Sequence, residues 1–153
     1  MTTTEDRLQA IEDRFALQDT LTAFCEAIDS LTDMDGLLAC FTEDAILDLS
    51  GLDLAVFKGH DGIRGFFQQV YDDMSHHAHY NTNFAIDKLE GDEASCRNYV
   101  IGMGATPDGR TVLAYVKYWL DYTRTPQGWK ISKFYEAALM PLGDGVTNIH
   151  GRD

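Results

Sequence analysis

The first apolar pattern along the chain has the period of a helix. Apolar side chains between residues 5 and 31 recur at three- and four-residue spacing, and they are Leu8, Ile11, Phe15, Leu17, Leu21, Phe24, Ile28 and Leu31. Acidic residues occupy the other side of this segment, namely Glu5, Glu12, Asp13, Asp19 and Glu26. The pattern predicts a long amphipathic helix, with hydroxyl groups at residues 2–4 available to cap its start. The same period over residues 34–41 and 61–74 predicts two shorter helices.

From about residue 78 the pattern has the period of strands. Segments bounded by turn sequences predict strands over residues 83–89, 94–103, 112–123 and 129–140, after two short strands over 45–49 and 55–57. Helices followed by hairpin-linked strands are typical of an α+β fold, with the helices packed on one face of the sheet. The sequence therefore predicts a single α+β domain over residues 1–153, with a loose tail over 143–153.

Composition and charge exclude several kinds of partner. The net charge of −13 repels phosphate backbones, so nucleic acid is not an expected partner. No run of ~18 apolar residues is present, so no membrane span is expected, and residues 1–7 lack the blocks of a signal peptide. The odd count of cysteines (Cys25, Cys40 and Cys96) predicts reduced thiols and a cytoplasmic protein. The absence of CxxC spacing argues against structural zinc.

Two features of the sequence can carry chemistry. Asp29 follows Ile28 at the end of the first helix, where the helix dipole and apolar surroundings raise its proton affinity unless a donor compensates. His76, His77 and His79 lie within four positions. A neutral imidazole accepts protons near pH 7 and needs a partner on its second nitrogen, and Asp29 is the obvious candidate.

Other interpretations of these residues stay open. Asp29 alone is also consistent with a solvated residue that ends a helix. The histidines are consistent with a surface cluster, or with a metal site, although no third ligand is evident from the sequence and no metal is therefore expected.

Alternation in the strands predicts where a cavity lies. One face of the segment 94–102 carries Ala94, Asn98, Val100 and Gly102, and one face of the segment 114–120 carries Ala114, Val116, Tyr118 and Leu120. Small residues on a face that should be core leave space for a cavity with few polar groups. A tightly packed core, with Asn98 bonded to the backbone, is the alternative. No GxGxxG, P-loop or GxSxG motif is present, so no cofactor is expected.

Several short segments, in this order, carry a resemblance to a known family. They are Ala16–Asp19, Ile28-Asp29, Phe41–Ala45, His79–Asn83 and Gly128–Ile131. From about residue 5 to residue 141, the chain resembles the SnoaL-like branch of the nuclear transport factor 2-like superfamily, which includes scytalone dehydratase and hexachlorocyclohexane dehydrochlorinase. The resemblance implies a cone-shaped α+β barrel, in which helices pack on a curved antiparallel or mixed sheet around one pocket for a small hydrophobic molecule.

The resemblance also implies roles for particular residues. In lyases of this branch, a helix-end aspartate orients a histidine that removes a proton from carbon, and Asp29 and His79 match these two positions. Ile28, Asn98 and Phe134 stand where the relatives have groups that bind or activate a leaving group, so the substrate is expected to differ from theirs. By the same alignment, the pocket is lined by Phe24, Leu47, Val70, Met74, His77, Asn98, Val100, Ala114, Tyr118 and Phe134.

These observations predict a lyase without a cofactor, of the dehydratase or dehydrohalogenase type, acting on a small cyclic substrate. His77, Asn98 and Tyr118 are the expected hydrogen-bond donors. The alternatives are an isomerase of the ketosteroid type and a non-catalytic binding or assembly module, such as the small subunit of a ring-hydroxylating dioxygenase. Aromatic residues on the strands (Tyr115, Trp119 and Tyr135) also predict a homo-oligomer, either a dimer or a trimer.

Overall fold

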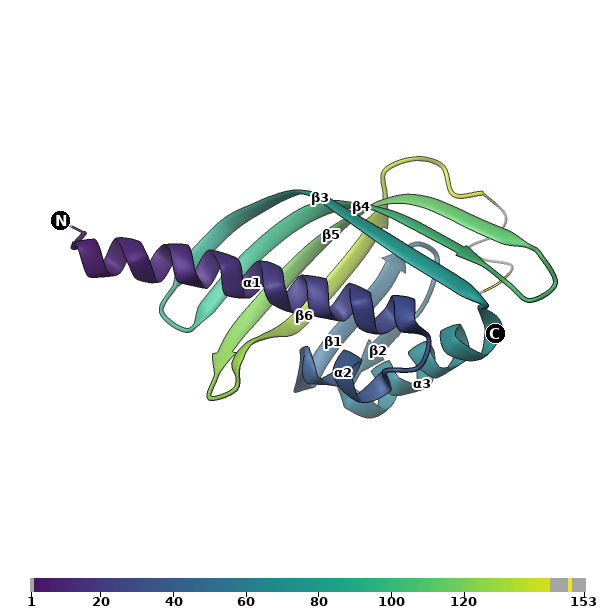
Figure 1. Ribbon diagram of the computed structural model, residues 1–153, viewed down its shortest axis with the longest axis horizontal. Helices are drawn as coiled ribbons and strands as arrows, with labels where there is room; N and C mark the ends of the chain where they lie inside the picture. Colours follow the sequence, from purple (N-terminus) through teal and green to yellow (C-terminus); the bar gives the residue numbers. More distant parts are fainter. Residues whose placement is uncertain (1, 144–148, 150–153) are drawn as a thin grey trace.

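The computed structural model, which describes residues 2–143 and 149, contains helices packed against one six-stranded sheet. The helices are α1 (Thr4–Ser30), α2 (Met34–Ala39) and α3 (Gly59–Asp73). The strands are β1 (Phe41–Gly51), β2 (Val56–Lys58), β3 (His76–Glu90), β4 (Glu93–Ala105), β5 (Thr111–Thr125) and β6 (Gly128–Ala138). Their order in the sheet is β2-β1-β6-β5-β4-β3, and only β1 and β6 run parallel to each other. Figure 1 shows this arrangement.

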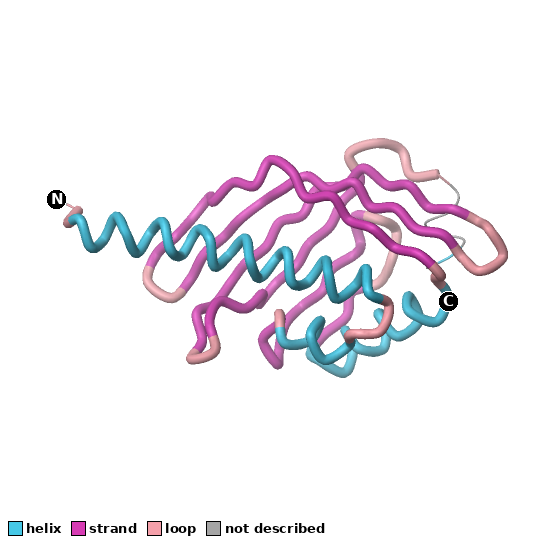
Figure 2. The backbone as a smooth tube through the Cα atoms, viewed as in Figure 1, coloured by secondary structure: helices cyan, strands magenta, loops and turns pink. Residues whose placement is uncertain are grey.

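The sheet is curved but not closed, because β2 and β3 form its two edges. α1 runs across one face of the sheet, and α2 and α3 lie near β1 and β2 (Figure 2). Phe24 of α1 lies at the centre of the core, and its ring lies 5.3 Å from that of Phe41, 5.9 Å from that of Phe67 and 5.3 Å from that of Phe134. The predicted α+β fold, with helices on one face of a mixed sheet, is therefore confirmed.

Both ends of α1 are fixed by local hydrogen bonds. At its start, Thr3 and Asp6 form a reciprocal capping box, in which the Asp6 amide donates to Thr3 Oγ1 at 3.0 Å and the Thr3 amide donates to Asp6 Oδ2 at 2.7 Å. At its end, Leu31 adopts a left-handed conformation with φ of 56° and stops the helix. The Ser30 hydroxyl donates to the Ala27 carbonyl at 2.7 Å. The last turn, which carries Asp29, is thereby held in place.

The predicted apolar stripe of α1 was wrong in its first half. Leu8, Ile11 and Phe15 are 55%, 52% and 60% exposed, because they lie on the side of α1 opposite to its buried residues. Asp13, which was placed on the polar side, is buried. Burial of the apolar stripe begins only at Leu17.

The start of β3 also differs from the prediction. The strand begins at His76 and not at residue 83, so the histidine cluster lies within the sheet. A register shift between Thr82 and Ala85, with Asn83 at φ of 55°, interrupts the pairing with β4. Residues 76–82 are mostly polar because they border the site described below, and this polarity hid the strand from pattern analysis.

Three other predictions concern surfaces and the chain end. Among the described residues, no helix is long and apolar enough to cross a membrane. Tyr115 and Trp119 are exposed on the sheet, and the homo-oligomer that they imply stays a prediction. The predicted tail over 143–153 lies largely outside the described residues.

Asp13 joins the middle of α1 to the far end of the sheet. Its carboxylate accepts two hydrogen bonds from Arg124 of β5, at 2.8 Å each, and one from Trp129 Nε1 of β6 at 3.1 Å. The Arg124 guanidinium also stacks 4.3 Å from the Trp129 ring. The hydrogen bonds from Arg124 outweigh the effect of burial and lower the pKa of Asp13 below its usual range.

Replacement of Asp13 with asparagine is expected to lower the free energy of unfolding by about 2 kcal/mol, because Arg124 loses its buried charged partner and keeps only the exposed Asp92. The loss should be present above pH about 4 and vanish as the pH falls through the lowered pKa of Asp13. Urea denaturation at several pH values measures it. Asp19→Asn, on the exposed side of the same helix, is the matched control. Equal stabilities of the two variants would contradict this account of the network.

Candidate active site

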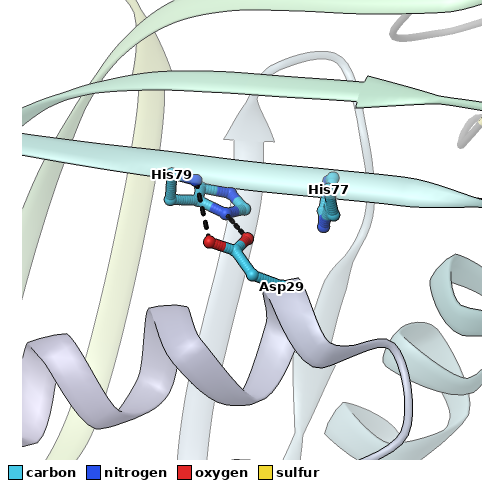
Figure 3. A group of neighbouring side chains, drawn as sticks. All are labelled: Asp29, His77 and His79. Carbon is cyan, nitrogen blue, oxygen red and sulfur yellow. Dashed lines mark hydrogen bonds and ion pairs between the residues drawn. The ribbon is translucent and has the colours of Figure 1, made fainter.

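The last turn of α1 places the Asp29 carboxylate against His79 of β3. Asp29 Oδ1 lies 2.6 Å from His79 Nδ1, and Oδ2 accepts the backbone N–H of His79 at 2.9 Å. Figure 3 shows both contacts, with the carboxylate directed from the helix to the strand. Because β3 is an edge strand, its outward N–H groups are open to such a partner. The predicted pairing of these two residues is present.

The electrostatics of the pair define which ring nitrogen is free. Burial alone would raise the pKa of Asp29, but hydrogen bonds from the His79 ring and backbone, together with the electrostatic interaction with that ring, lower it below its usual range. An ionised carboxylate only accepts hydrogen bonds, so Nδ1 of His79 carries the proton that it donates to Asp29. Nε2 of the neutral ring therefore carries the lone pair, and it is the nitrogen that can accept a proton.

Gly102 of β4 gives this nitrogen its space. It pairs with His79 across the sheet, and a Cβ atom on Gly102 would lie 3.7 Å from both Nε2 and Cδ2 of the ring. Gly102 and His79 both line one cavity. The proton-accepting nitrogen consequently lies beside the cavity wall.

His77 lies next to this pair on the same strand. Its ring meets the His79 ring edge to face, with centroids 4.8 Å apart and an interplanar angle of 84°. The candidate ligand atoms of Asp29, His77 and His79 lie within 4.8 Å of one another, so the structure does supply the third metal ligand that the sequence did not reveal. Both oxygens of Asp29 are nevertheless engaged by His79. The arrangement therefore fits a proton-transfer pair better than a cation site.

The cavity is enclosed mainly by apolar side chains from helices and strands. Its empty volume, including the part open to solvent, is about 730 Å³. Among the described residues that line it, those with polar side chains are His77, His79, Tyr118 and Glu136. A cavity of this composition is suited to a small hydrophobic compound held by few polar contacts.

Most of the residues predicted to line the pocket do so in the structure. Seven of them border the cavity, namely Phe24, Leu47, Val70, His77, Ala114, Tyr118 and Phe134. Met74, Asn98 and Val100 are buried outside its lining, in contrast to the prediction. Met74 instead packs where a side chain on Gly104 would collide with it. Asn98 donates to Asn81 Oδ1 at 2.8 Å and so serves a polar contact between neighbouring strands.

Sequence reasoning missed one polar lining residue, Glu136 of β6. Strand alternation could have found it, because Glu136 lies two positions after Phe134, which was predicted to face the pocket. Burial raises its pKa to about 8. Gly102 and Val116, on the strand faces predicted to border a cavity, do line it. The remaining missed residues are apolar, namely Ile28, Leu49, Leu52, Leu54, Phe66, Phe67, Met103 and Val112.

Comparisons with known proteins place this geometry in a family. The model of the SnoaL-like domain matches residues 9–135. An uncharacterized protein of Mycobacterium tuberculosis is 31% identical over 132 residues, which are 82% of this chain and 85% of that protein. The crystal structure of a candidate aromatic ring hydroxylase from Novosphingobium aromaticivorans is 50% identical, with a TM-score of 0.88 over 91% of this chain and 97% of that chain.

Two more distant structures share the fold. A candidate scytalone dehydratase from N. aromaticivorans is 19% identical, with a TM-score of 0.78 over 90% of this chain and 89% of that chain. A hexachlorocyclohexane dehydrochlorinase from Novosphingobium barchaimii is 21% identical, with a TM-score of 0.76 over 91% and 95% of the two chains. With its sequence match, its helix-on-sheet architecture and its single described apolar cavity beside a His–Asp pair, the chain belongs to the SnoaL-like domain family.

Proposed function

We propose that the protein is a lyase in which His79 removes a proton from carbon of a small cyclic substrate. The observation that carries the proposal is the 2.6 Å contact between Asp29 Oδ1 and His79 Nδ1, which leaves Nε2 of a cavity-lining ring as proton acceptor. The fold shared with dehydratases and dehydrochlorinases supports the same class of reaction. Elimination requires a base at the carbon and a leaving group on its neighbour, and it needs no redox chemistry.

The pair accounts for the first chemical step. As Nε2 takes the proton, the ring becomes an imidazolium ion that hydrogen-bonds to an ionised carboxylate, and this charge pairing stabilises the transition state. Apolar walls strengthen the effect, because charges interact more strongly where water is excluded. The electron pair of the broken C–H bond forms the new double bond as the leaving group departs.

A second candidate function is favoured by the 50% identical structure, whose name refers to hydroxylation of aromatic rings. On this alternative, the chain is a binding or assembly module, such as the small subunit of a ring-hydroxylating dioxygenase. An isomerase of the ketosteroid type is a less suitable match, since such an enzyme normally uses a carboxylate as the base, while Asp29 is occupied by His79.

The proposal is tested with a panel of cyclic ketones and hydroxylated or halogenated ring compounds in D₂O. Mass spectrometry detects the unsaturated product of elimination, and it also detects deuterium that enters the substrate where proton abstraction is reversible. His79→Ala should lower the rate by at least about 100-fold, because the base is removed. Dialysis against EDTA should leave the rate unchanged.

The matched control is His76→Ala, an exposed histidine on the same strand that does not line the cavity. This variant should catalyse deuterium exchange into the substrate at the wild-type rate. Absence of both product and exchange with the wild type on the whole panel would favour the assembly module, and loss of activity with EDTA would replace the proton-transfer pair by a metal centre.

The orienting role of Asp29 has a spectroscopic test. In Asp29→Asn, the backbone N–H of His79 can only donate, so the amide oxygen must face it and the amide NH₂ must face Nδ1. Nδ1 then becomes an acceptor, and the neutral ring should change from the Nδ1–H to the Nε2–H tautomer. Long-range ¹H–¹⁵N NMR distinguishes the two tautomers. An unchanged tautomer in the variant would show that Asp29 does not orient the ring.

A further inference from the structure

The cavity contains a second titratable group that the proposed His–Asp chemistry does not use. Glu136 lies on β6, and His79 lies on β3, so the sheet positions of the two residues are separated by β5 and β4. Both nevertheless line the same cavity, because the sheet is curved around it. Among the described residues, no hydrogen bond or ion pair reaches the Glu136 carboxyl group, and burial is the one cause that raises its pKa.

The backbone around Glu136 is rigidly placed. It pairs with Tyr118 of β5, and Tyr118 also lines the cavity. On the other side, β1 approaches so closely that a Cβ atom on Gly51 would lie 2.4 Å from the Glu136 carbonyl oxygen. Only glycine fits there, so the strand that presents Glu136 is fixed between β1 and β5.

The groups that face Glu136 do not neutralise it. Tyr118 and Cys25 interact with it electrostatically, and burial raises the pKa of Tyr118 well above 10 and that of Cys25 to about 12, so both are uncharged near neutral pH. Asp29 of α1 interacts electrostatically with the same tyrosine and cysteine. His77 and His79 of β3 complete the titratable lining. No lysine or arginine borders the described cavity.

We propose that Glu136 is the general acid of this site and that the leaving group is therefore an oxygen, which makes the reaction a dehydration of a hydroxylated ring compound. The inference rests on the proposed function of His79 as base. Of the two classes of elimination, it selects dehydration over dehydrohalogenation.

The chemistry of the leaving group supplies the reason. Hydroxide leaves poorly and needs a proton as the C–O bond breaks, whereas a halide leaves as a stable anion without one. Nε2 takes the proton from carbon, the C–H electron pair becomes the double bond, the C–O bond breaks, and the Glu136 proton completes a water molecule. The carboxylate and the imidazolium then return to their starting states by a net proton transfer from His79 to Glu136, so the overall products are the alkene and water. A halide would instead profit from a cation, and no lysine or arginine is found in the cavity lining among residues 2–143 and 149.

The experiment compares two substrates that differ only in the leaving group, one with a hydroxyl and one with a bromide, on the ring that shows the fastest deuterium exchange. Glu136→Gln should slow loss of the hydroxyl by at least about 100-fold. The same variant should eliminate bromide and exchange deuterium at nearly the wild-type rate, because His79 is intact. Glu43→Gln, an exposed residue outside the cavity, is the matched control.

The pH profile gives a second measurement. With the wild type, loss of the hydroxyl should fall as the pH rises through about 8, where Glu136 loses its proton, and loss of bromide should not fall. The acid role would be overturned if Glu136→Gln lowered the elimination rates of both substrates equally, or if it left the rate of hydroxyl loss unchanged. Bromide elimination that depends on His79 would in that case still support the proposed lyase, so the two failures are distinguishable.

Stability provides a readout without substrate. The pKa of Glu136 is raised from 4.5 to about 8 in the folded protein, so the folded state binds more protons than the unfolded state between these values. Wild-type stability should therefore fall as the pH rises over this interval and level off above it. Relative to the wild type, the Tm of Glu136→Gln should increase from pH 5 to pH 8. A Tm difference between the variant and the wild type that stays constant from pH 5 to pH 8 would show that Glu136 is already ionised at neutral pH. This result would overturn the proposal.

Discussion

The contact between Asp29 and His79 joins two parts of the chain that are 50 residues apart. It combines a charged hydrogen bond to the ring with a second bond to the backbone N–H of the same residue. The second bond satisfies a free donor on the edge strand β3, so it fixes the strand, while the first fixes the ring and its tautomer. One carboxylate therefore positions both the wall of the cavity and the nitrogen that faces it. The helix cap at Leu31 and the Ser30 hydroxyl matter because they set where that carboxylate lies.

The curvature of the sheet and the small residues on it create the space in which this pair can act. Gly102 and Ala114 occupy paired positions on β4 and β5, where larger side chains would fill the cavity beside His79. Phe24, Phe67 and Phe134 close the cavity with rings that contact one another through Phe24. Apolar enclosure has two consequences. It is suited to a hydrophobic compound, and it strengthens the interaction of the few polar groups that remain.

The pKa values of the two carboxyl groups near the cavity are shifted in opposite directions. Asp29 receives hydrogen bonds from His79, so its pKa falls despite burial. Glu136 has no such donor among the described residues, so burial alone acts and its pKa rises to about 8. Two groups of nearly identical chemistry are thus suited to different tasks, one as a permanent anion that orients the base and one as a source of a proton. This division is the basis for proposing that the leaving group is an oxygen.

The sequence by itself determined the number and order of nearly all elements, because the periods of helices and strands and the turn sequences between strands are local properties. It also indicated Asp29 and His79, since the end of an amphipathic helix and a histidine cluster can be recognised without knowing the fold. Tertiary structure decided what depends on distant neighbours. Leu8, Ile11 and Phe15 are exposed because the sheet packs against the other side of α1. That side carries Asp13, which is buried with its partner Arg124, 111 residues away. The curvature shared by β3 to β6 decided that Glu136 faces the cavity and Asn98 does not. Alternation along a strand assigns a residue to one face of a sheet, but it does not say which part of that face encloses space.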